Sequence, residues 1–345
     1  MKLFEARARL KKCIEIMDKG NSLMSYVAIV TEPGNVENYW VEFGTENKKM
    51  GNYTDKIRLE LNGTKGNKTK NNYGNLLSSH QKLKECVRPI RAGTSICENV
   101  SICKSGTLGI LFKLEGYDSP FGISNMHVLS SYLSTGENRN ILITNEHQEI
   151  IQPSSSDRTD LFYTIDKEVP IGQTVWETFN GLVDAAVFQI YENESCSVGI
   201  FNSEINDLNN NQIKEPKLNR GCQKAGRTTG FTQAKILSVE AAIRIENPFH
   251  KINGLGKYVV FTDQIMTENM AASGDSGSVL FSEKHVVGLT FADIDFDSNI
   301  SISGSGTTHT CGRTFHNKMT NVFSSVVLPN GKGDFLKPKF KNFLI

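Results

Sequence analysis

The sequence predicts an all-β fold, a sandwich or a barrel of short strands. From about residue 87 onward, short apolar segments recur at intervals of roughly 8 to 15 residues. Turn-forming Gly, Asn, Asp and Ser separate these segments, and helical periodicity is scarce between them. Such a series of strands and turns is typical of sandwiches and barrels. The clearest predicted strands are residues 107–112, 140–144, 185–190, 257–261 and 286–291.

The first 86 residues differ from this pattern and are predicted to form an N-terminal extension. Apolar side chains recur at helical spacing over residues 4–18, so we expect a short amphipathic helix there. Residues 62–75 have almost no apolar side chains, which predicts a mobile loop or linker. Strands are expected within the extension at residues 26–30, 39–43 and 57–61.

The composition excludes several classes of function. Hydrophobic residues make up 38% and charged residues 22% of the 345 positions, which is typical of a globular protein. The formal net charge is +1, so no overall field favours nucleic acid or an acidic membrane surface. No apolar run approaches the roughly 18–20 residues that span a bilayer. The charged N-terminus lacks the apolar core of a secretory signal, and we therefore expect a cytoplasmic protein.

The cysteines argue against both a disulfide framework and a zinc site. The chain has seven of them, an odd number, and no Cys-x-x-Cys pair. We expect reduced thiols that mostly serve as small buried apolar residues. No cluster of metal-ligating residues is visible in the sequence, so no metal and no organic cofactor is expected.

Ser276 is the candidate nucleophile. It lies in the run Gly274-Asp275-Ser276-Gly277, and an apolar strand follows at residues 279–281. The two glycines permit a sharp turn and a close approach of a substrate backbone. Such a turn can direct the N–H groups of Gly274 and Ser276 at one point, which is the geometry of an oxyanion hole. Taken alone, the same run is also an ordinary β-turn sequence.

A serine nucleophile needs a base, and the base needs a third group to orient it. His127 follows a strand ending in Ser-Asn-Met and is the candidate base, although a lone histidine in an apolar run is often a buried structural residue. Asp184 lies among apolar strand residues, where an acid is costly unless it is paired. A histidine N–H would pair it; the alternative is a turn cap after Gly181. The order His127, Asp184, Ser276 is that of chymotrypsin and differs from that of subtilisins and α/β-hydrolases.

Between about Arg88 and Val327 the chain resembles the trypsin-like serine proteases, in particular a bacterial branch of them. The resemblance implies two six-stranded antiparallel β-barrels with the active site in the cleft between them. It divides the chain into an extension (1–86), a protease domain (87–327) and a C-terminal tail (328–345) expected to pack loosely or to extend to a partner. The motifs that carry it are Pro89-Ile90-Arg91-Ala92-Gly93-Thr94-Ser95-Ile96, Gly106-Thr107-Leu108-Gly109, Ser124-Asn125-Met126-His127-Val128-Leu129, Gln152-Pro153, Val183-Asp184-Ala185-Ala186, Lys224-Ala225-Gly226-Arg227-Thr228-Thr229-Gly230, Gly274-Asp275-Ser276-Gly277-Ser278 and Val287-Gly288-Leu289.

The resemblance also raises questions of specificity and activation. In the family, the residue six before the nucleophile lies at the base of the pocket for the substrate side chain. Met270 has this position and favours an apolar side chain, whereas Asp293 in the following strand would favour a basic one; both remain open. In secreted members the acid before the nucleophile, here Asp275, pairs with a newly cut N-terminal amine. Here Ile90 or a neighbour could supply such an amine if the chain were cut near Arg88. Pro89 would hinder that cut, so we favour an internal partner for Asp275.

These observations predict a serine endopeptidase that acts on protein or peptide substrates through His127, Asp184 and Ser276. Some members of the bacterial branch cut partner proteins in cell defence, and that role extends to this chain only by family analogy. Residues 1–86 are a candidate regulatory or partner-binding module; the alternative is a packing extension over the first barrel. Two further alternatives are an inactive trypsin-like binding module and an enzyme held latent by residues 1–86. The run 226–230 is predicted as a structural turn in which Arg227 can pair or cap.

Overall fold

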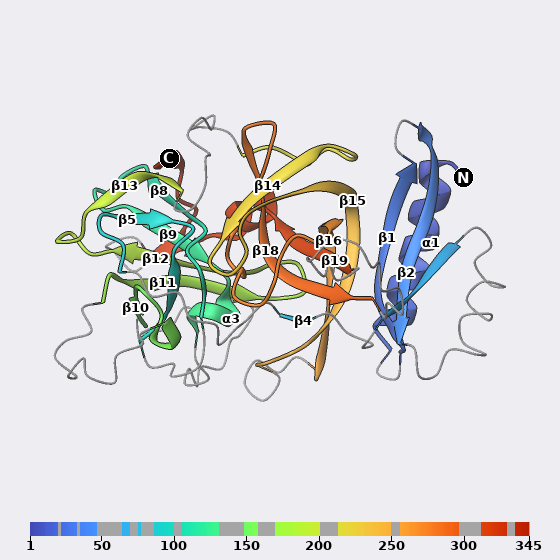
Figure 1. Cartoon of the computed structure of the whole chain (residues 1–345), viewed down its shortest axis with the longest axis horizontal. Helices are drawn as coiled ribbons and strands as arrows, with labels where there is room; N and C mark the ends of the chain where they lie inside the picture. Colours follow the sequence, from blue (N-terminus) through green and yellow to red (C-terminus); the bar gives the residue numbers. More distant parts are fainter. Residues whose placement is uncertain are drawn as a thin grey trace, which may run out of the picture.

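The structure, a computed structural model, consists mainly of β-strands arranged in two sheet bodies that lie side by side (Figure 1). This confirms the predicted all-β class. In the described part, none of the helices combines the length and the apolar character needed to cross a membrane. The described residues are 1–19, 22–32, 35–46, 64–69, 75–76, 86–99, 105–130, 148–157, 170–200, 213–249, 256–296, 312–329 and 335–344.

The first sheet body contains His127 and Asp184. Its strands are β6 (Ser95–Glu98), β7 (Gly106–Thr107), β8 (Ile110–Leu114), β9 (Phe121–Ser124), β10 (Glu149–Ile151), β11 (Gly172–Phe179), β12 (Asp184–Ile190) and β22 (Phe340–Leu344). They are ordered β22-β8-β9-β12-β11-β10-β6-β7. Beside them lie the parallel pair β5 (Ile90–Ala92) and β13 (Cys196–Ile200), the helix α3 (Met126–Leu129) and the 3-10 turn η2 (Ser155–Asp157).

The second sheet body contains Ser276 and closes into a ring. Its strands are β14 (Gly221–Gly226), β15 (Gly230–Glu246), β16 (Tyr258–Glu268), β17 (Val279–Ser282), β18 (His285–Asp295) and β19 (Gly312–Lys318). They follow the order β14-β17-β18-β19-β16-β15, and β14 also pairs with β15. These pairings form a six-stranded barrel, which the helix α4 (Met319–Ser325) and the short pair β20 (Leu328–Pro329) and β21 (Phe335–Leu336) follow.

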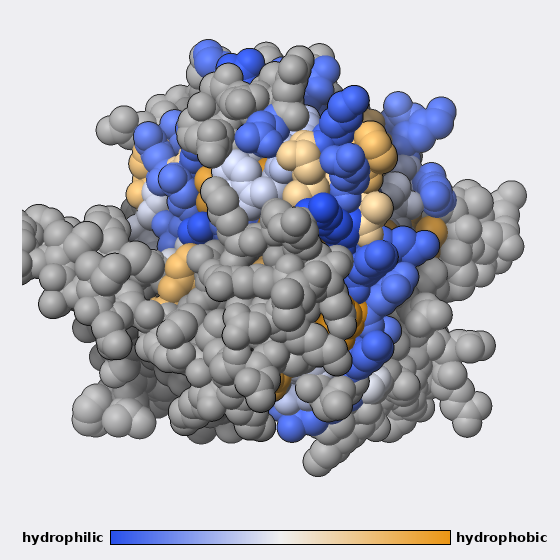
Figure 2. Space-filling model, turned by 90° about the vertical axis from the view of Figure 1, so that its right-hand side faces the viewer, coloured by the Kyte–Doolittle hydropathy of each residue, from blue (hydrophilic) through white to orange (hydrophobic). Residues whose placement is uncertain are grey.

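The N-terminal extension joins the second body rather than covering the first. It consists of α1 (Leu3–Met17), β1 (Met24–Glu32), β2 (Asn35–Glu46), β3 (Thr64–Thr69) and β4 (Asn75–Leu76). β1 pairs antiparallel with β15, for example Val27 with Ala242, so the sheet continues from the barrel into the extension. One face of α1 packs on β1 and β2, as its helical pattern predicts. Figure 2 faces this side of the molecule, where hydrophilic residues predominate among those coloured.

Two sequence expectations need correction. The predicted loop at residues 62–75 contains β3, which pairs in parallel with the edge of β2. The pairing needs only backbone groups, so the hydrophobic pattern carried no signal for it. The C-terminal tail is expected to pack loosely or to extend to a partner. Instead, its strand β22 pairs with β8 and extends the first sheet. The predicted strands at 57–61 and 140–144 lie outside the described residues.

Aromatic side chains join the two bodies in one apolar core. Phe179 of β11 packs against Phe261 of β16, with ring centroids 5.0 Å apart. Phe261 in turn contacts Phe291 of β18 at 5.1 Å. All three side chains are buried. Because this core fixes one body against the other, residues that come from different sheets can meet with defined geometry.

The packing of the extension predicts different effects for two phenylalanines. Phe43→Ala removes a fully buried ring of β2 between α1 and β1, and should lower the free energy of unfolding by about 3–5 kcal/mol. Phe4→Ala removes a ring that is 68% exposed on α1 and should leave stability nearly unchanged. Denaturant unfolding of both variants measures the difference. Equal effects would contradict the placement of the extension.

Candidate active site

Ser276 lies in the tight turn between β16 and β17. Gly274 and Gly277 adopt φ values of 101° and 91°, a region that favours glycine. A Cβ on Gly277 would lie 2.0 Å from the Ser124 hydroxyl oxygen, so the turn also needs glycine for space. The sequence Gly274-Asp275-Ser276-Gly277 therefore fits this turn for steric reasons as well as chemical ones.

The structure brings His127, Asp184 and Ser276 together in one line of hydrogen bonds. His127 Nε2 lies 2.9 Å from Ser276 Oγ. His127 Nδ1 lies 2.5 Å from Asp184 Oδ2, and the backbone N–H of His127 donates to Asp184 Oδ1 at 3.2 Å. All three residues are at most 3% exposed. His127 is the second residue of α3 and Asp184 begins β12, so the first sheet body supplies both while the barrel supplies the serine.

Two amide side chains bond to Asp184 and a third bonds to one of them, and sequence reasoning missed the role of all three. Asn125 Nδ2 donates to the backbone carbonyl of Asp184 at 2.7 Å. The backbone N–H of Asp184 donates to Asn317 Oδ1 at 3.0 Å, and Asn317 Nδ2 donates to Gln264 Oε1 at 2.7 Å. Only Asn125 had a sequence signal, since it lies two residues before His127. Asn317 comes from β19 and meets Asp184 only through the packing of the two bodies, and Gln264 of β16 acts through Asn317.

Asp275 has the internal partner that the sequence analysis favoured. Lys224 Nζ of β14 donates to Asp275 Oδ2 at 2.9 Å, and neither side chain is exposed. The backbone N–H groups of Thr228, Thr229 and Ala272 donate to the same carboxylate. Burial alone would raise the pKa of Asp275, but the charge of Lys224 and hydrogen bonds from the Thr229 hydroxyl, Lys224 and the Ala272 N–H outweigh it and lower that pKa. The carboxylate is therefore held in its charged form.

The alternative partner for Asp275, a new amine at Ile90, is engaged elsewhere. Ile90 is fully buried in β5, and its backbone N–H donates to the carbonyl of Ser195 at 2.8 Å. With Lys224 present, the turn at Ser276 is formed in the uncut chain.

A second buried ion pair ties the nucleophile turn to the first body. Arg227 donates to both carboxylate oxygens of Asp157, and the hydroxyls of Ser95 and Ser154 donate to the same acid. The backbone N–H of Arg227 donates to Thr107 Oγ1. Thr107 Oγ1 donates in turn to the carbonyl of Gly274 at 2.9 Å. The structural turn predicted for residues 226–230, with Arg227 available for pairing, is confirmed.

The two candidate pocket residues lie in different surroundings. Met270 is 5% exposed and packs in an apolar cluster with Ile236, Leu280 and other core residues. Asp293 belongs to β18 and pairs with Thr314 of β19. Their proposed contact with a substrate side chain stays a prediction.

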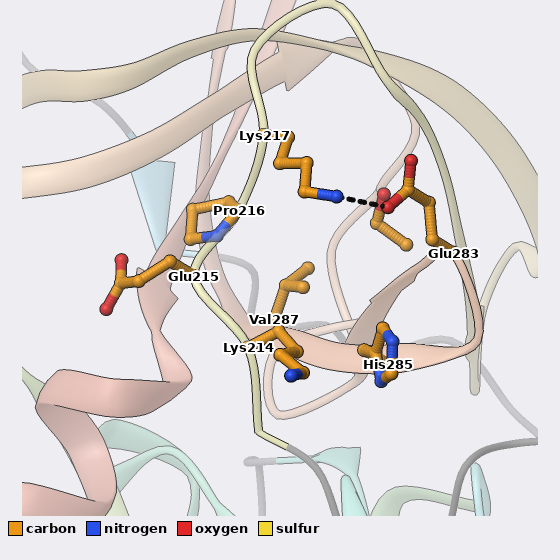
Figure 3. Close-up of a pocket in the computed structure, with 8 residues that line it drawn as sticks. Lys214, Glu215, Pro216, Lys217, Glu283, His285 and Val287 are labelled. Atoms are coloured by element: carbon orange, nitrogen blue, oxygen red, sulfur yellow. Dashed lines mark hydrogen bonds and ion pairs between the residues drawn. The ribbon is translucent and has the colours of Figure 1, made fainter.

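His316 and His285, two histidines outside the triad, have other surroundings. Burial lowers the pKa of His316 to about 3, so this fully buried ring is neutral. It shares hydrogen bonds with the hydroxyls of Thr290 and Thr267. His285 lines a cavity of about 360 Å³ between residues 214–217 and the turn after β17 (Figure 3). None of the triad residues lines this cavity.

No metal-binding cluster of His, Cys, Asp and Glu occurs within the part of the chain that the structure describes. The arrangement can instead perform proton transfer. A histidine between a carboxylate and a hydroxyl can accept the hydroxyl proton, because the carboxylate stabilises the resulting imidazolium.

Comparison with known proteins finds similarity among solved structures. No family model and no curated protein sequence matches the chain. Among solved structures, it is similar to Thermobifida fusca protease A (14% identity, TM-score 0.43, covering 68% of this chain and 94% of that one). It is also similar to a glutamic acid-specific serine protease described as using a histidine triad in substrate binding. The identity is 15% and the TM-score 0.44, and the match covers 68% of this chain and 97% of that one. For Cellulomonas bogoriensis chymotrypsin the identity is 16% and the TM-score 0.42, and the match covers 68% of this chain and 94% of that one. Identities and TM-scores this low support no shared activity.

The buried pair beneath the nucleophile turn predicts a strong effect of losing one partner. Lys224→Met leaves the Asp275 carboxylate buried without its cation and should lower the free energy of unfolding by about 3–5 kcal/mol. Lys217→Met removes the same side chain from an exposed pair with Glu283 and should change stability little. Urea unfolding of both variants tests this, and an equally mild effect at Lys224 would contradict its role.

Proposed function

We propose that the protein is a serine endopeptidase in which Ser276 is the nucleophile. The observation that carries the proposal is the continuous hydrogen-bond chain from Asp184 through His127 to Ser276. Each member is buried, and each comes from a separate segment of the fold. Burying these polar groups costs free energy, and an apolar core would stabilise the fold better. The arrangement is therefore better explained by catalysis than by stability.

The chemistry follows from the roles of the three side chains. Ser276 Oγ attacks the carbonyl carbon of the substrate peptide bond while its proton passes to His127 Nε2. His127 then gives the proton to the leaving amine, and an acyl-enzyme forms on Ser276. Water, deprotonated by His127, attacks the acyl carbon and releases the acid product. Asp184 accepts the Nδ1–H of His127, which fixes the tautomer with a free Nε2 and stabilises the imidazolium.

The oxyanion of the tetrahedral intermediate needs two donors, and we assign them to the backbone N–H groups of Gly274 and Ser276. No hydrogen bond between described residues uses either N–H. Asp275, between them, is fixed by Lys224, so the turn is organised before substrate binds. Each such donor contributes about 3–4 kcal/mol to the transition state in comparable acyl-transfer sites.

The proposed substrate is a protein or peptide. More specifically, we propose that the protease is a regulated effector that cleaves a partner protein. Met270 and Asp293 are the residues proposed to choose the substrate side chain. A peptide-library digest with the wild type and Ser276→Ala identifies that side chain. We expect discrete cleavage sites with the wild type and none with Ser276→Ala.

Covalent labelling tests the assignment of the triad directly. A small alkyl fluorophosphonate should label Ser276, and labelling should disappear in both Ser276→Ala and His127→Ala. Asp184→Asn, which favours the wrong histidine tautomer, should lower kcat on a peptide substrate by roughly 10,000-fold. Mass spectrometry of the labelled peptide identifies the site.

His285→Ala is the matched control, because His285 lines the cavity away from the triad. This variant should label at the wild-type rate. Intact labelling of His127→Ala would show that another group is the base.

A further inference from the structure

The strand β18 has two edges, and the edge that pairs with β17 continues past the nucleophile. Along the opposite edge β19 pairs without a gap in the register from Gly288 to Asp295, apart from a bulge after Thr290. The pairing with β17 extends only as far as Leu289. The chain that precedes β17 is the turn that carries Ser276. Beyond Leu289, therefore, the β17 edge of β18 leaves its sheet partner and runs past the candidate active site.

Three contacts show how closely this edge follows the turn. The N–H of Gly277 donates to the carbonyl of Thr290 at 2.9 Å, and the N–H of Thr290 donates to the carbonyl of Ser278 at 2.9 Å. Ser276 Oγ lies 3.3 Å from the carbonyl oxygen of Phe291. Ala292 and Asp293, which follow Phe291, are thus the first residues of β18 that lie beyond the contact with Ser276.

A segment of the N-terminal extension pairs with these positions. In β4, Leu76 pairs with Ala292 and Asn75 with Asp293, in antiparallel register. Since β19 pairs with the same two residues on the other edge, β4 lies on the edge that runs past Ser276. The antiparallel register also means that β4 runs from Asp293 towards Phe291, in the direction of the nucleophile.

We propose that β4 is an internal competitor for the β18 edge on which a peptide substrate pairs, so that the chain holds its own active site partly closed. The inference rests on the proposed function of Ser276. An extended peptide that adds to a free sheet edge gains backbone hydrogen bonds whatever its sequence. A peptide that paired with Ala292 and Asp293 as β4 does would run towards Ser276, with a peptide bond within its reach.

The edge recognises extended backbone, so the substrate must be an unfolded or locally extended segment, because helices already use their backbone donors and acceptors. Substrate and β4 cannot both pair with Ala292 and Asp293. Activity on peptides therefore depends on how often β4 leaves the edge, whereas access of a small reagent to Ser276 does not.

Two probes of different size test the competition in the full chain. The double variant Asn75→Pro, Leu76→Pro removes both backbone N–H groups of β4 and prevents regular pairing. Acetyl-tripeptide phosphonates, one with leucine and one with lysine at the reacting end, should label Ser276 of this variant roughly tenfold faster than in the wild type, a change that equals about 1.4 kcal/mol. A small alkyl fluorophosphonate should label both proteins at the same rate.

The control Asn71→Pro, Asn72→Pro places two prolines in the same segment but outside β4, and should keep wild-type rates with both kinds of probe. Thermal unfolding should give the same midpoint for all three proteins. If the small reagent labels Ser276 but the β4 prolines do not accelerate either peptide probe, the competition is wrong while the protease assignment stands. If the small reagent fails to label Ser276 of the wild type, both are wrong.

Discussion

The candidate active site depends on the contact between Thr107 of the first body and the nucleophile turn of the second. The N–H of Thr107 donates to the carbonyl of Ser276 at 2.8 Å, and its hydroxyl donates to the carbonyl of Gly274. Ser124, three residues before His127, donates to the carbonyl of Thr107. The segment that holds the base is thus bonded to the segment that holds the turn. The aromatic core holds the two bodies together, and this junction sets the local position of the Ser276 turn relative to His127.

Buried charges give this junction its shape. Lys224 pairs with Asp275 on one side of the turn, and Arg227 pairs with Asp157 on the other. Buried ion pairs often add little net stability, because desolvation offsets their attraction. Their hydrogen bonds are directional, however, and an apolar replacement would not fix the orientation of the Gly274 and Ser276 backbone. The charges are better understood as setting a conformation than as strengthening the fold.

Much of this site could be predicted from the sequence, because its chemistry lies in short motifs. His127, Asp184 and Ser276 each had an ordinary structural alternative, but their order and their motifs indicated a triad. The structure brings them within hydrogen-bonding distance. The supporting residues were hidden for a physical reason. Asn317 approaches Asp184 only across the packed bodies, Gln264 bonds to Asn317, and nothing local distinguishes either from a surface amide. β3 and β4 were missed because their pairing uses backbone groups, which every sequence offers equally.

The pairing of β1 with β15 has a consequence for how the chain can be divided. Residues 230–235 of β15 pair with β14 and close the barrel. Further along the same strand, Ala241 to Ile243 pair with β1. The extension thus acts as an edge cap for a long strand. A fragment lacking it would present unpaired backbone donors and acceptors next to buried apolar side chains, which is a template for association between copies. The first 46 residues therefore cover backbone groups that β15 would otherwise expose.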